Sequence, residues 1–379
     1  MHSNIKKIFL TILVVILPTI SFCINSDIIN VNIFSKIEYS ANLLQYPEIT
    51  EVSLKHKFLY QDNISNKIKY LDNTPITDNT ILALEESRNL NNIQPTNFFG
   101  WTLKRSNIRM YPTDSVLKYH LKDQNDRNQY SSIGTFEPLV ILHLSTDKKW
   151  GYVQTFFTRG WLKLSDLTTT NRKTFLEIFS MDKLAVIKNN LPIDNFTFNI
   201  GDKIPIISEN INSYNVLLPN MQSILIPKNN SLYIKNPKYN ISIINYIIEQ
   251  LIGKMYDWGG KNGLWDCSSL IMDIYRVFGI HLPRNSNHQA EVGKLLLEYP
   301  FTKEKFYETL KTANPYCTFL YMKGHIMLYT GIENNDYSIV HAVQTIDGNI
   351  IDAIVKQYLI KDNLHIENKV LKIVTICDK

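Results

Sequence analysis

A single cysteine at the start of an amphipathic helix, directly after a glycine turn, is the feature that most constrains this chain. Residues 256–289 read YDWGGKNGLWDCSSLIMDIYRVFGIHLPRNSNHQ, and Cys267 lies where the helical pattern begins. Asp266 can cap that helix and Gly279 can end it. Its apolar residues recur at helical spacing, namely Leu270, Ile271, Ile274, Tyr275 and Phe278. Free amides and the helix dipole stabilise a thiolate at this position, so we expect a lowered cysteine pKa when a cationic partner is near.

Two histidines downstream each lie in an alternating segment that predicts a β-strand. GHIMLYTG contains His325 and DYSIVHAV contains His341, with the turn-forming residues ENND between them. The pair predicts a β-hairpin on which both histidines can face one cleft. A cysteine at a helix start, an imidazole on one strand and an orienting group on the next activate the nucleophile in papain-like hydrolases. We therefore expect Cys267 to attack a carbonyl, His325 to exchange the proton, and His341 to fix the tautomer of His325.

These residues resemble the NlpC-type bacterial cell-wall cysteine peptidases. YDWGG, DCSSL, FGIHLPRNSNHQ, GHIMLYTG and IVHA occur in the family's order, so the resemblance covers residues 240–379. It implies a catalytic triad of Cys267, His325 and His341, with Tyr256 as a hydroxyl donor to the oxyanion. It also implies a thioester intermediate and no cofactor. Members of the family form with bacterial SH3-like domains ahead of the peptidase cut the bond between γ-D-glutamate and a diamino acid in murein peptides.

The resemblance further implies a pocket for the free N-terminal ammonium of the peptide. Asp266, Ser268 and Ser286 match the residues that hold this ammonium in the SH3-linked relatives. A buried carboxylate facing an ammonium is also an effective way to require an unblocked amine. Capping explains the same residues differently, since Asp266 is a good N-cap and Ser286 has the capping-box spacing with Gln289. Tyr111 is expected either to wall this pocket or to be an ordinary strand aromatic.

The middle of the chain alternates apolar and polar residues in short runs, which predicts small β-barrels. STDKKWGYVQTFFTRGWLKLSDL resembles the second half of a bacterial SH3-like domain, and GDKIPIISENINSYNVLLPN begins a weaker second copy. We expect an α+β protein in which the helix bearing the cysteine packs on an antiparallel sheet. The expected organisation is a signal peptide over 1–23, an N-terminal segment packing on the other domains over 24–97, SH3-like domains over 98–170 and 171–238, and the peptidase domain over 239–379.

The first residues predict export. Lys6 and Lys7 precede the apolar run IFLTILVVILPTI, and small residues follow at the positions that a signal peptidase reads. Cys23 is an alternative lipoprotein acceptor, but the bulky Phe22 before it argues against lipidation. Pro18 interrupts a run that is short for a membrane span, so no span is expected after signal removal. The expected location is secreted or periplasmic, in the cell envelope.

Cleavage after Cys23 leaves three cysteines, so at least one thiol stays free. Cys317 and Cys377 lie in apolar segments and are expected to be buried packing residues, with a disulfide between them as an open alternative. The 379 residues carry a formal charge of +5, with lysines scattered among Asn and Ile. This charge suits loose attraction to an anionic wall polymer, and the lysines form no patch that would predict nucleic-acid binding.

The expected function is a secreted thiol peptidase acting on L-Ala-γ-D-Glu-diaminopimelate peptides with a free N-terminal L-Ala. Three alternatives remain at this point. Cys267, His325 and His341 are also a possible zinc-ligand set, although the HExxH type of motif that accompanies catalytic zinc is missing from the sequence. A murein amidase or acyltransferase would use the same triad. The third alternative is a non-catalytic wall-binding protein, and against it stands the presence of both the cysteine and the histidine.

Overall fold

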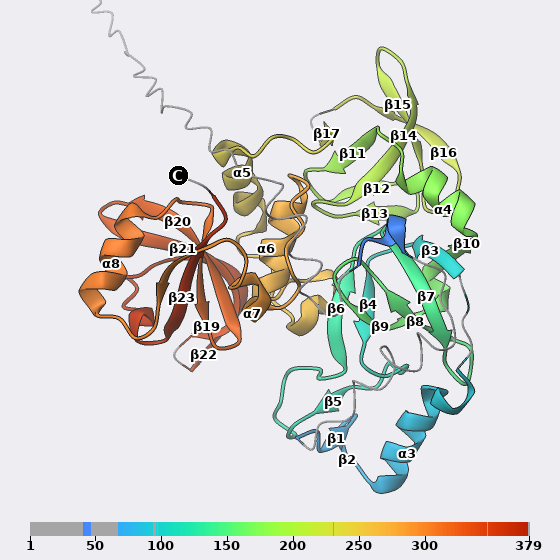
Figure 1. Ribbon diagram of the computed structural model, residues 1–379, viewed down its shortest axis with the longest axis horizontal. Coiled ribbons are helices and arrows are strands. Elements are labelled where there is room, and N and C mark those ends of the chain that lie inside the picture. Colours follow the sequence, from blue (N-terminus) through green and yellow to red (C-terminus); the bar gives the residue numbers. More distant parts are fainter. Residues whose placement is uncertain are drawn as a thin grey trace, which may run out of the picture.

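The computed structural model describes residues 41–46, 67–93, 96, 98–229, 231–346 and 348–377. The expected signal peptide over 1–23 and much of the segment over 24–97 lie outside this part. The described residues form two β-rich regions followed by a mixed helix and sheet region (Figure 1). None of the helices described is long and apolar enough to span a membrane.

The first β-rich region is a seven-stranded antiparallel sheet with the order β10-β3-β7-β8-β9-β4-β6. Its core is aromatic, because Phe99, Tyr152 and Trp161 point to one buried cluster. A smaller sheet, in the order β2-β1-β5, and helix α3 pack below it (Figure 1). The elements are η1 Leu43–Gln45, β1 Tyr70–Leu71, β2 Thr74–Pro75, α3 Asp78–Ser87, η2 Leu90–Asn92, β3 Phe98–Thr102, β4 Ser106–Arg109, β5 Leu117–Lys118, β6 Gln129–Ile133, β7 Pro138–Leu144, β8 Trp150–Gln154, β9 Arg159–Lys163, η3 Leu164–Asp166 and β10 Leu167–Thr170.

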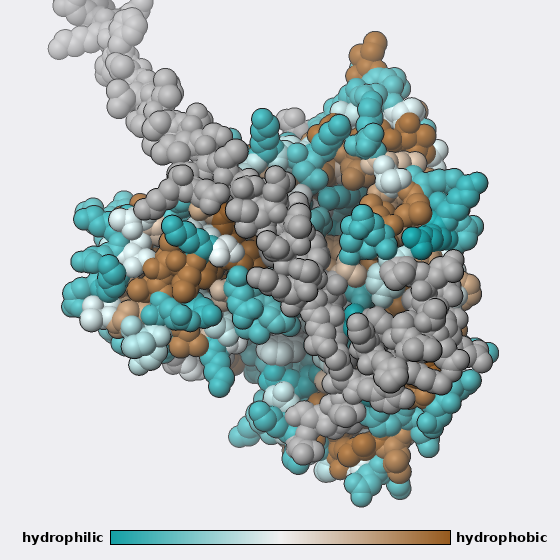
Figure 2. All heavy atoms as spheres, in the orientation of Figure 1, coloured by the Kyte–Doolittle hydropathy of each residue, from teal (hydrophilic) through white to brown (hydrophobic). Residues whose placement is uncertain are grey.

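The second β-rich region follows helix α4 and is a five-stranded sheet in the order β16-β15-β14-β11-β17, with β12 and β13 paired beside it. Apolar side chains remain exposed on its outer hairpins, including Ile207, Ile211 and Leu225, and Figure 2 shows such a patch at the end of this region. The elements are α4 Arg172–Phe179, β11 Leu184–Ile187, β12 Leu191–Ile193, β13 Phe196–Phe198, β14 Lys203–Glu209, β15 Ser213–Leu217, β16 Ser223–Pro227 and β17 Leu232–Ile234.

The C-terminal region is a six-stranded antiparallel sheet, in the order β18-β23-β19-β20-β21-β22, with helices on both faces. Strand alternation explains the two layers. Ile326 and Leu328 of β20 join the core shared with α6, whereas Met327 and Tyr329 join the core shared with α8. The elements are α5 Ile241–Leu251, η4 Trp258–Gly263, α6 Cys267–Arg276, α7 Ser286–Gln289, β18 Lys294–Glu298, α8 Lys303–Thr312, β19 Thr318–Met322, β20 His325–Glu333, β21 Asp336–Ile346, β22 Asn349–Tyr358, η5 Ile366–Asn368 and β23 Val370–Thr375.

A buried ionic cluster joins the three regions behind α6. Arg276 of α6 is paired with Glu137 of the first β-rich region and lies 3.3 Å from Asp202 Oδ1 of the second. The same guanidinium lies 3.5 Å from Asp273 Oδ1, one turn earlier on α6. Burial raises the pKa of Asp202 to about 7 even though Arg276 opposes the shift. Helix α6 is therefore fixed against both β-rich regions, and the position of its first residue depends on all three parts.

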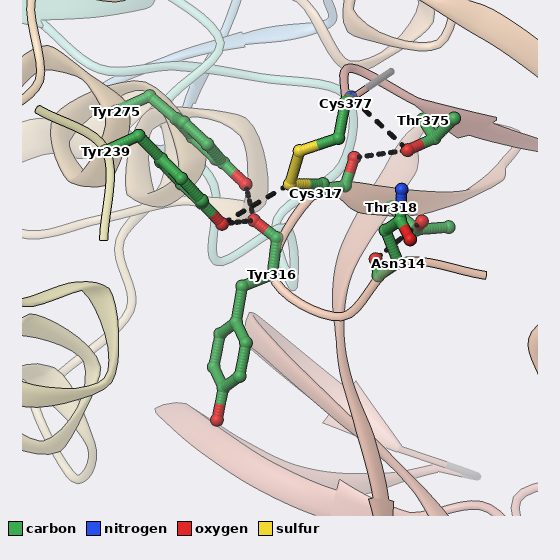
Figure 3. Close-up of a disulfide and its surroundings, with 8 residues drawn as sticks. All are labelled: Tyr239, Tyr275, Asn314, Tyr316, Cys317, Thr318, Thr375 and Cys377. Carbon is green, nitrogen blue, oxygen red and sulfur yellow. Dashed lines mark hydrogen bonds between the residues drawn. A yellow bond between two sulfur atoms is a disulfide. The ribbon is translucent and has the colours of Figure 1, made fainter. Parts of the chain in front are cut away.

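A disulfide joins Cys317, which precedes β19, to Cys377, which follows β23 (Figure 3). The prediction that these cysteines are buried was correct, but their interpretation as unpaired packing residues was wrong, because β19 and β23 are neighbouring strands that bring the two sulfurs together. The Tyr239 hydroxyl lies 3.4 Å from the Cys317 sulfur and donates to the Tyr316 carbonyl oxygen at 2.7 Å. Cys267 is the free cysteine among the described residues.

Replacing both Cys317 and Cys377 by alanine should lower stability while preserving the cleft. The disulfide closes a loop with a sequence separation of 60, and loss of such a cross-link typically costs about 2–5 kcal/mol. Urea denaturation of the double variant and of the reduced and oxidised wild type measures this cost. An oxidised wild type no more stable than the reduced protein or the double variant would contradict the pairing.

Candidate active site

Helix α6 begins at Cys267 because Asp266 caps it, as the sequence predicts. The Asp266 Oδ1 atom accepts a hydrogen bond from the Ser269 backbone N–H at 2.8 Å. In return the Ser269 hydroxyl oxygen accepts from the Asp266 backbone N–H at 2.9 Å, which completes a capping box. The two bonds satisfy amide groups that a helix start leaves unpaired. The cap thus fixes the backbone on both sides of Cys267.

Two glycines of the turn before α6 allow the first β-rich region to approach the cleft. Gly259 and Gly260 have φ angles of +68° and +65°, which disfavour a side chain. A Cβ atom on Gly259 would lie 2.6 Å from Cγ of Gln129, and one on Gly260 would lie 2.9 Å from the hydroxyl of Ser132. Strand β6 therefore packs directly on this turn and forms one wall of the site.

The two predicted histidines meet across neighbouring strands. His325 begins β20, and its Nε2 atom lies 2.7 Å from Nδ1 of His341 on β21. The Nε2 atom of His341 lies 2.8 Å from Oε1 of Gln357 on β22. Sequence reasoning missed Gln357. Its segment alternates like a strand, but no local pattern shows which residue of a third strand lies beside His341.

These residues surround a cleft of about 540 Å³. All predicted site residues except one line it, namely Tyr256, Asp266, Cys267, Ser268, Ser286, His325 and His341. Gln129 and Tyr130 of β6 also line it, so the C-terminal region and the first β-rich region both contribute. Gln344 of β21 bridges the two regions, because its amide Nε2 donates to Asn125 Oδ1 at 3.1 Å. The cleft is thus bounded by two parts of the molecule.

Tyr111 does not line this cleft, which corrects its expected place in the pocket wall. Its side chain is fully buried in a separate apolar cluster with Leu84 and Leu117. Its hydroxyl donates to Glu85 Oε1 at 2.5 Å. The cluster and the bond to α3 fit the interpretation of Tyr111 as a structural aromatic. Tyr130 takes the wall position instead.

Arg284 organises the binding side of the cleft, and the sequence prediction did not include it. It pairs with both carboxylate oxygens of Asp266, Nη1 with Oδ1 at 3.1 Å and Nη2 with Oδ2 at 2.6 Å. Its remaining donors reach the hydroxyls of Ser268 at 2.8 Å and Ser131 of β6 at 2.7 Å. Burial alone would raise the pKa of Asp266, but Arg284 and the Ser269 amide outweigh burial and lower it. Asp266 is therefore ionised.

Helix α7 begins one residue earlier than the predicted capping box requires. Asn285 is the N-cap and Ser286 is the first helical residue, so Ser286 with Gln289 does not form a capping box. The Gln289 amide instead donates to the carbonyl oxygens of Ser268 at 2.9 Å and Pro283 at 2.7 Å. These tertiary bonds tie α7 to the first turn of α6 and leave Ser286 lining the cleft.

The direction of the Cys267 pKa shift differs from the prediction. Burial and the Asp266 carboxylate raise the pKa of the Cys267 thiol to about 12, against the smaller opposing effects of nearby amides and Arg284. Burial, together with His341, lowers the pKa of His325 to about 3. Both shifts favour the neutral form of each group taken by itself. The helix start does not outweigh the loss of solvation at this depth.

Tyr256 keeps its proton throughout the working pH range. Burial, followed by the nearby Asp266 and Cys267, raises the pKa of its hydroxyl well above the ordinary value of 10.0. A protonated phenol donates a hydrogen bond, which is the property that stabilisation of an oxyanion requires.

The described part of the chain contains no cluster of three or more His, Cys, Asp or Glu side chains placed to hold a metal ion.

The fold and the cleft are those of a papain-like α+β domain with a cysteine at a helix start. Residues 253–367 match the model of the NlpC/P60 family, and residues 124–163 match an SH3 domain of the SH3b1 type. The chain therefore contains an NlpC/P60 domain preceded by an SH3b domain. The resemblance to NlpC-type proteins with SH3-like domains, and the α+β fold class, are both confirmed.

Similar proteins include a γ-D-glutamyl-L-lysine dipeptidyl-peptidase from Bacillus cereus, which is 32% identical over 96 residues. That match covers 24% of this chain and 29% of the relative, so it spans less than a third of the relative's length. A novel NlpC/P60 endopeptidase from Photobacterium damselae subsp. piscicida has a TM-score of 0.69 at 20% identity, covering 93% of this chain and 90% of that one. An NlpC/P60 family protein from Bacillus cereus has a TM-score of 0.50 at 18% identity, covering 66% and 83%. At these identities the two structures show a shared fold.

Alkylation by iodoacetamide should report the neutral thiol. Because the thiolate is the reactive form and the Cys267 pKa is raised, the rate should keep rising from pH 6 to pH 9 without a plateau. Mass spectrometry of the modified peptide follows Cys267 specifically, with the Cys267→Ala variant as the background. A rate that is already constant at pH 6 to 7 would instead show a preformed thiolate and imidazolium pair.

Proposed function

We propose that this protein is a cysteine peptidase of the cell envelope that hydrolyses the γ-D-glutamyl-diamino acid bond of murein peptides with a free N-terminal L-Ala. The observation that carries the proposal is the meeting of Cys267, at the capped start of α6, with the His325 and His341 pair in one cleft. The NlpC/P60 match and the B. cereus relative's name support this substrate class. The envelope location follows from the predicted signal peptide over 1–23.

In the first step, the Cys267 thiol transfers its proton to Nδ1 of His325 as the sulfur attacks the γ-carbonyl carbon. The carbonyl π electrons move to oxygen, and the oxyanion accepts hydrogen bonds from the Cys267 backbone N–H and the Tyr256 hydroxyl. The backbone N–H is available because it belongs to the first residue of α6. His341 accepts the Nε2 proton of His325 in a hydrogen bond and so supports the imidazolium.

Collapse of this intermediate breaks the C–N bond and leaves a thioester. The imidazolium returns its proton to the leaving nitrogen, which departs as the amine of the diamino acid. His325 then takes a proton from water as the water oxygen attacks the thioester carbon. The second intermediate collapses to release the γ-D-glutamyl carboxylic acid, and the Cys267 sulfur regains a proton.

The wall that β6 adds to the cleft supports a small released peptide as substrate. Gln129 and Tyr130 belong to that wall, and Gln344 joins it to Asn125. A chain that continues into glycan would have to pass through this wall. The cleft therefore suits a peptide whose N-terminus ends inside the protein, as in muropeptide fragments that have already been released from the glycan.

A free ammonium finds acceptors in the same cleft. Asp266 Oδ2 accepts from Arg284 and retains a second lone pair, while the hydroxyls of Ser268 and Ser286 lie along the cleft. Arg284 offsets much of the Asp266 charge, so the serine hydroxyls carry part of the recognition. An acylated nitrogen has fewer donors and no charge, and it would leave these acceptors unpaired.

The activity is tested by mass spectrometry of the mature chain incubated with L-Ala-γ-D-Glu-meso-diaminopimelate, its N-acetylated analogue and intact murein. Release of diaminopimelate from the free-amine peptide alone is the expected result. Cys267→Ala should lower kcat by a factor on the order of 10⁴ or more, with no loss of folding by circular dichroism. Cleavage of intact murein alone would replace the substrate by that of an amidase, and cleavage of none would reject the peptidase.

Ser286→Ala tests recognition of the amine. Loss of one hydrogen bond to a charged group should raise KM for the free-amine peptide by roughly fivefold to thirtyfold, while kcat changes little. Asn287→Ala is the matched control, since Asn287 lines the same cleft on the same short helix. Equal effects of the two substitutions on KM, or an unchanged ratio between free and acetylated peptides, would reject the role of Ser286.

A further inference from the structure

We propose that Gln357 is a positioning residue that selects the tautomer of both histidines and so presents the basic nitrogen of His325 to Cys267. The inference rests on the proposed peptidase function and extends it to a residue outside the triad. Gln357 lies on β22, the edge strand of the sheet, with its Oε1 atom 2.8 Å from Nε2 of His341.

The acceptor atom of Gln357 determines the tautomer of His341, and His341 then determines that of His325. The carbonyl oxygen of an amide side chain can only accept, so Nε2 of His341 must carry a hydrogen. Burial lowers the pKa of His341 to about 4, so at neutral pH the ring carries one hydrogen, and its Nδ1 atom must be an acceptor. The 2.7 Å contact then requires His325 to donate from Nε2. The Nδ1 atom of His325 is left with the lone pair that takes the thiol proton.

A histidine in the third position makes this selection necessary. An asparagine or carboxylate oxygen can only accept, whereas a neutral imidazole can either donate or accept at Nδ1. If His341 carried its hydrogen on Nδ1, it would donate to Nε2 of His325. The hydrogen of His325 would then lie on Nδ1, and the ring would present no base to Cys267. An acceptor beyond His341 removes this second, unproductive state.

The surroundings hold Gln357 in place from both sides along the strand. Lys356 and Tyr358, its two chain neighbours, both bind Glu333 at the end of β20, with Nζ to Oε1 at 2.6 Å and the Tyr358 hydroxyl to Oε2 at 3.0 Å. Ladder pairing places Gln357 opposite Ile339, diagonal to His341. The anchored backbone therefore keeps the Gln357 side-chain amide within hydrogen-bonding distance of the His341 imidazole.

Gln357→Met tests the proposal, because methionine keeps the approximate size and cannot accept strongly. We expect kcat to fall about threefold to tenfold with little change in KM. Nitrogen-15 NMR of labelled histidine should show one tautomer for His325 in the wild type, with hydrogen on Nε2, and a mixture in the variant. Ile350→Ala is the structural control, since Ile350 is an exposed residue of the same strand and its replacement should leave the histidine spectrum unchanged.

Gln357→Glu supplies a conservative replacement that still accepts from His341. Above the pH at which His341 becomes neutral, its kcat should exceed that of Gln357→Met and its His325 spectrum should match the wild type. A Gln357→Met variant with wild-type kcat and tautomer would overturn the proposal, and so would lost activity with an unchanged histidine spectrum. The spectra need no substrate, so they test this proposal even if the assigned peptide is not cleaved.

Discussion

The buried ion pair of Asp266 and Arg284 holds together the parts that form the cleft. Asp266 caps the helix that begins with Cys267, and Arg284 comes from the loop before α7. Through Ser131 the same guanidinium reaches strand β6 of the first β-rich region. Removing either partner would leave an uncompensated charge at a buried position, which is far more costly than exchanging an exposed pair. The start of α6, the loop before α7 and strand β6 are thus held together by the same ion pair and its hydrogen bonds.

Burial also sets the chemistry of the nucleophile. The site excludes solvent well enough that both thiolate and imidazolium are disfavoured when each stands alone. In the proposed mechanism, charge therefore develops when the proton moves from the thiol to the imidazole, as the substrate oxygen also becomes negative and accepts its hydrogen bonds. A low dielectric strengthens those hydrogen bonds as it disfavours the isolated ions. The burial that raises the pKa of the Cys267 thiol can thus also stabilise the proposed transition state.

Local patterns predicted much of the molecule. The helix beginning at Cys267, its Asp266 cap and the histidine hairpin all follow from residues close together in sequence. Arg284 and Gln357 were missed because their importance depends on partners far away in sequence or on another strand. The pocket-wall alternative for Tyr111 is wrong for a related reason. Tyr111 lies after the end of β4, and whether its ring lines the cleft or joins the separate cluster depends on α3, whose packing the sequence pattern does not reveal.

The order of strands in the C-terminal sheet has a consequence for synthesis of the chain. Strand β23, the last strand of the described chain, lies between β18 and β19 inside the sheet. The earlier strands therefore lack a central partner until residues 370–375 have been made, and β18 has no other neighbour in the sheet. A domain whose sheet is completed so late is expected to stay unfinished during its synthesis. Strand order thus delays assembly of the cleft until the whole domain has emerged.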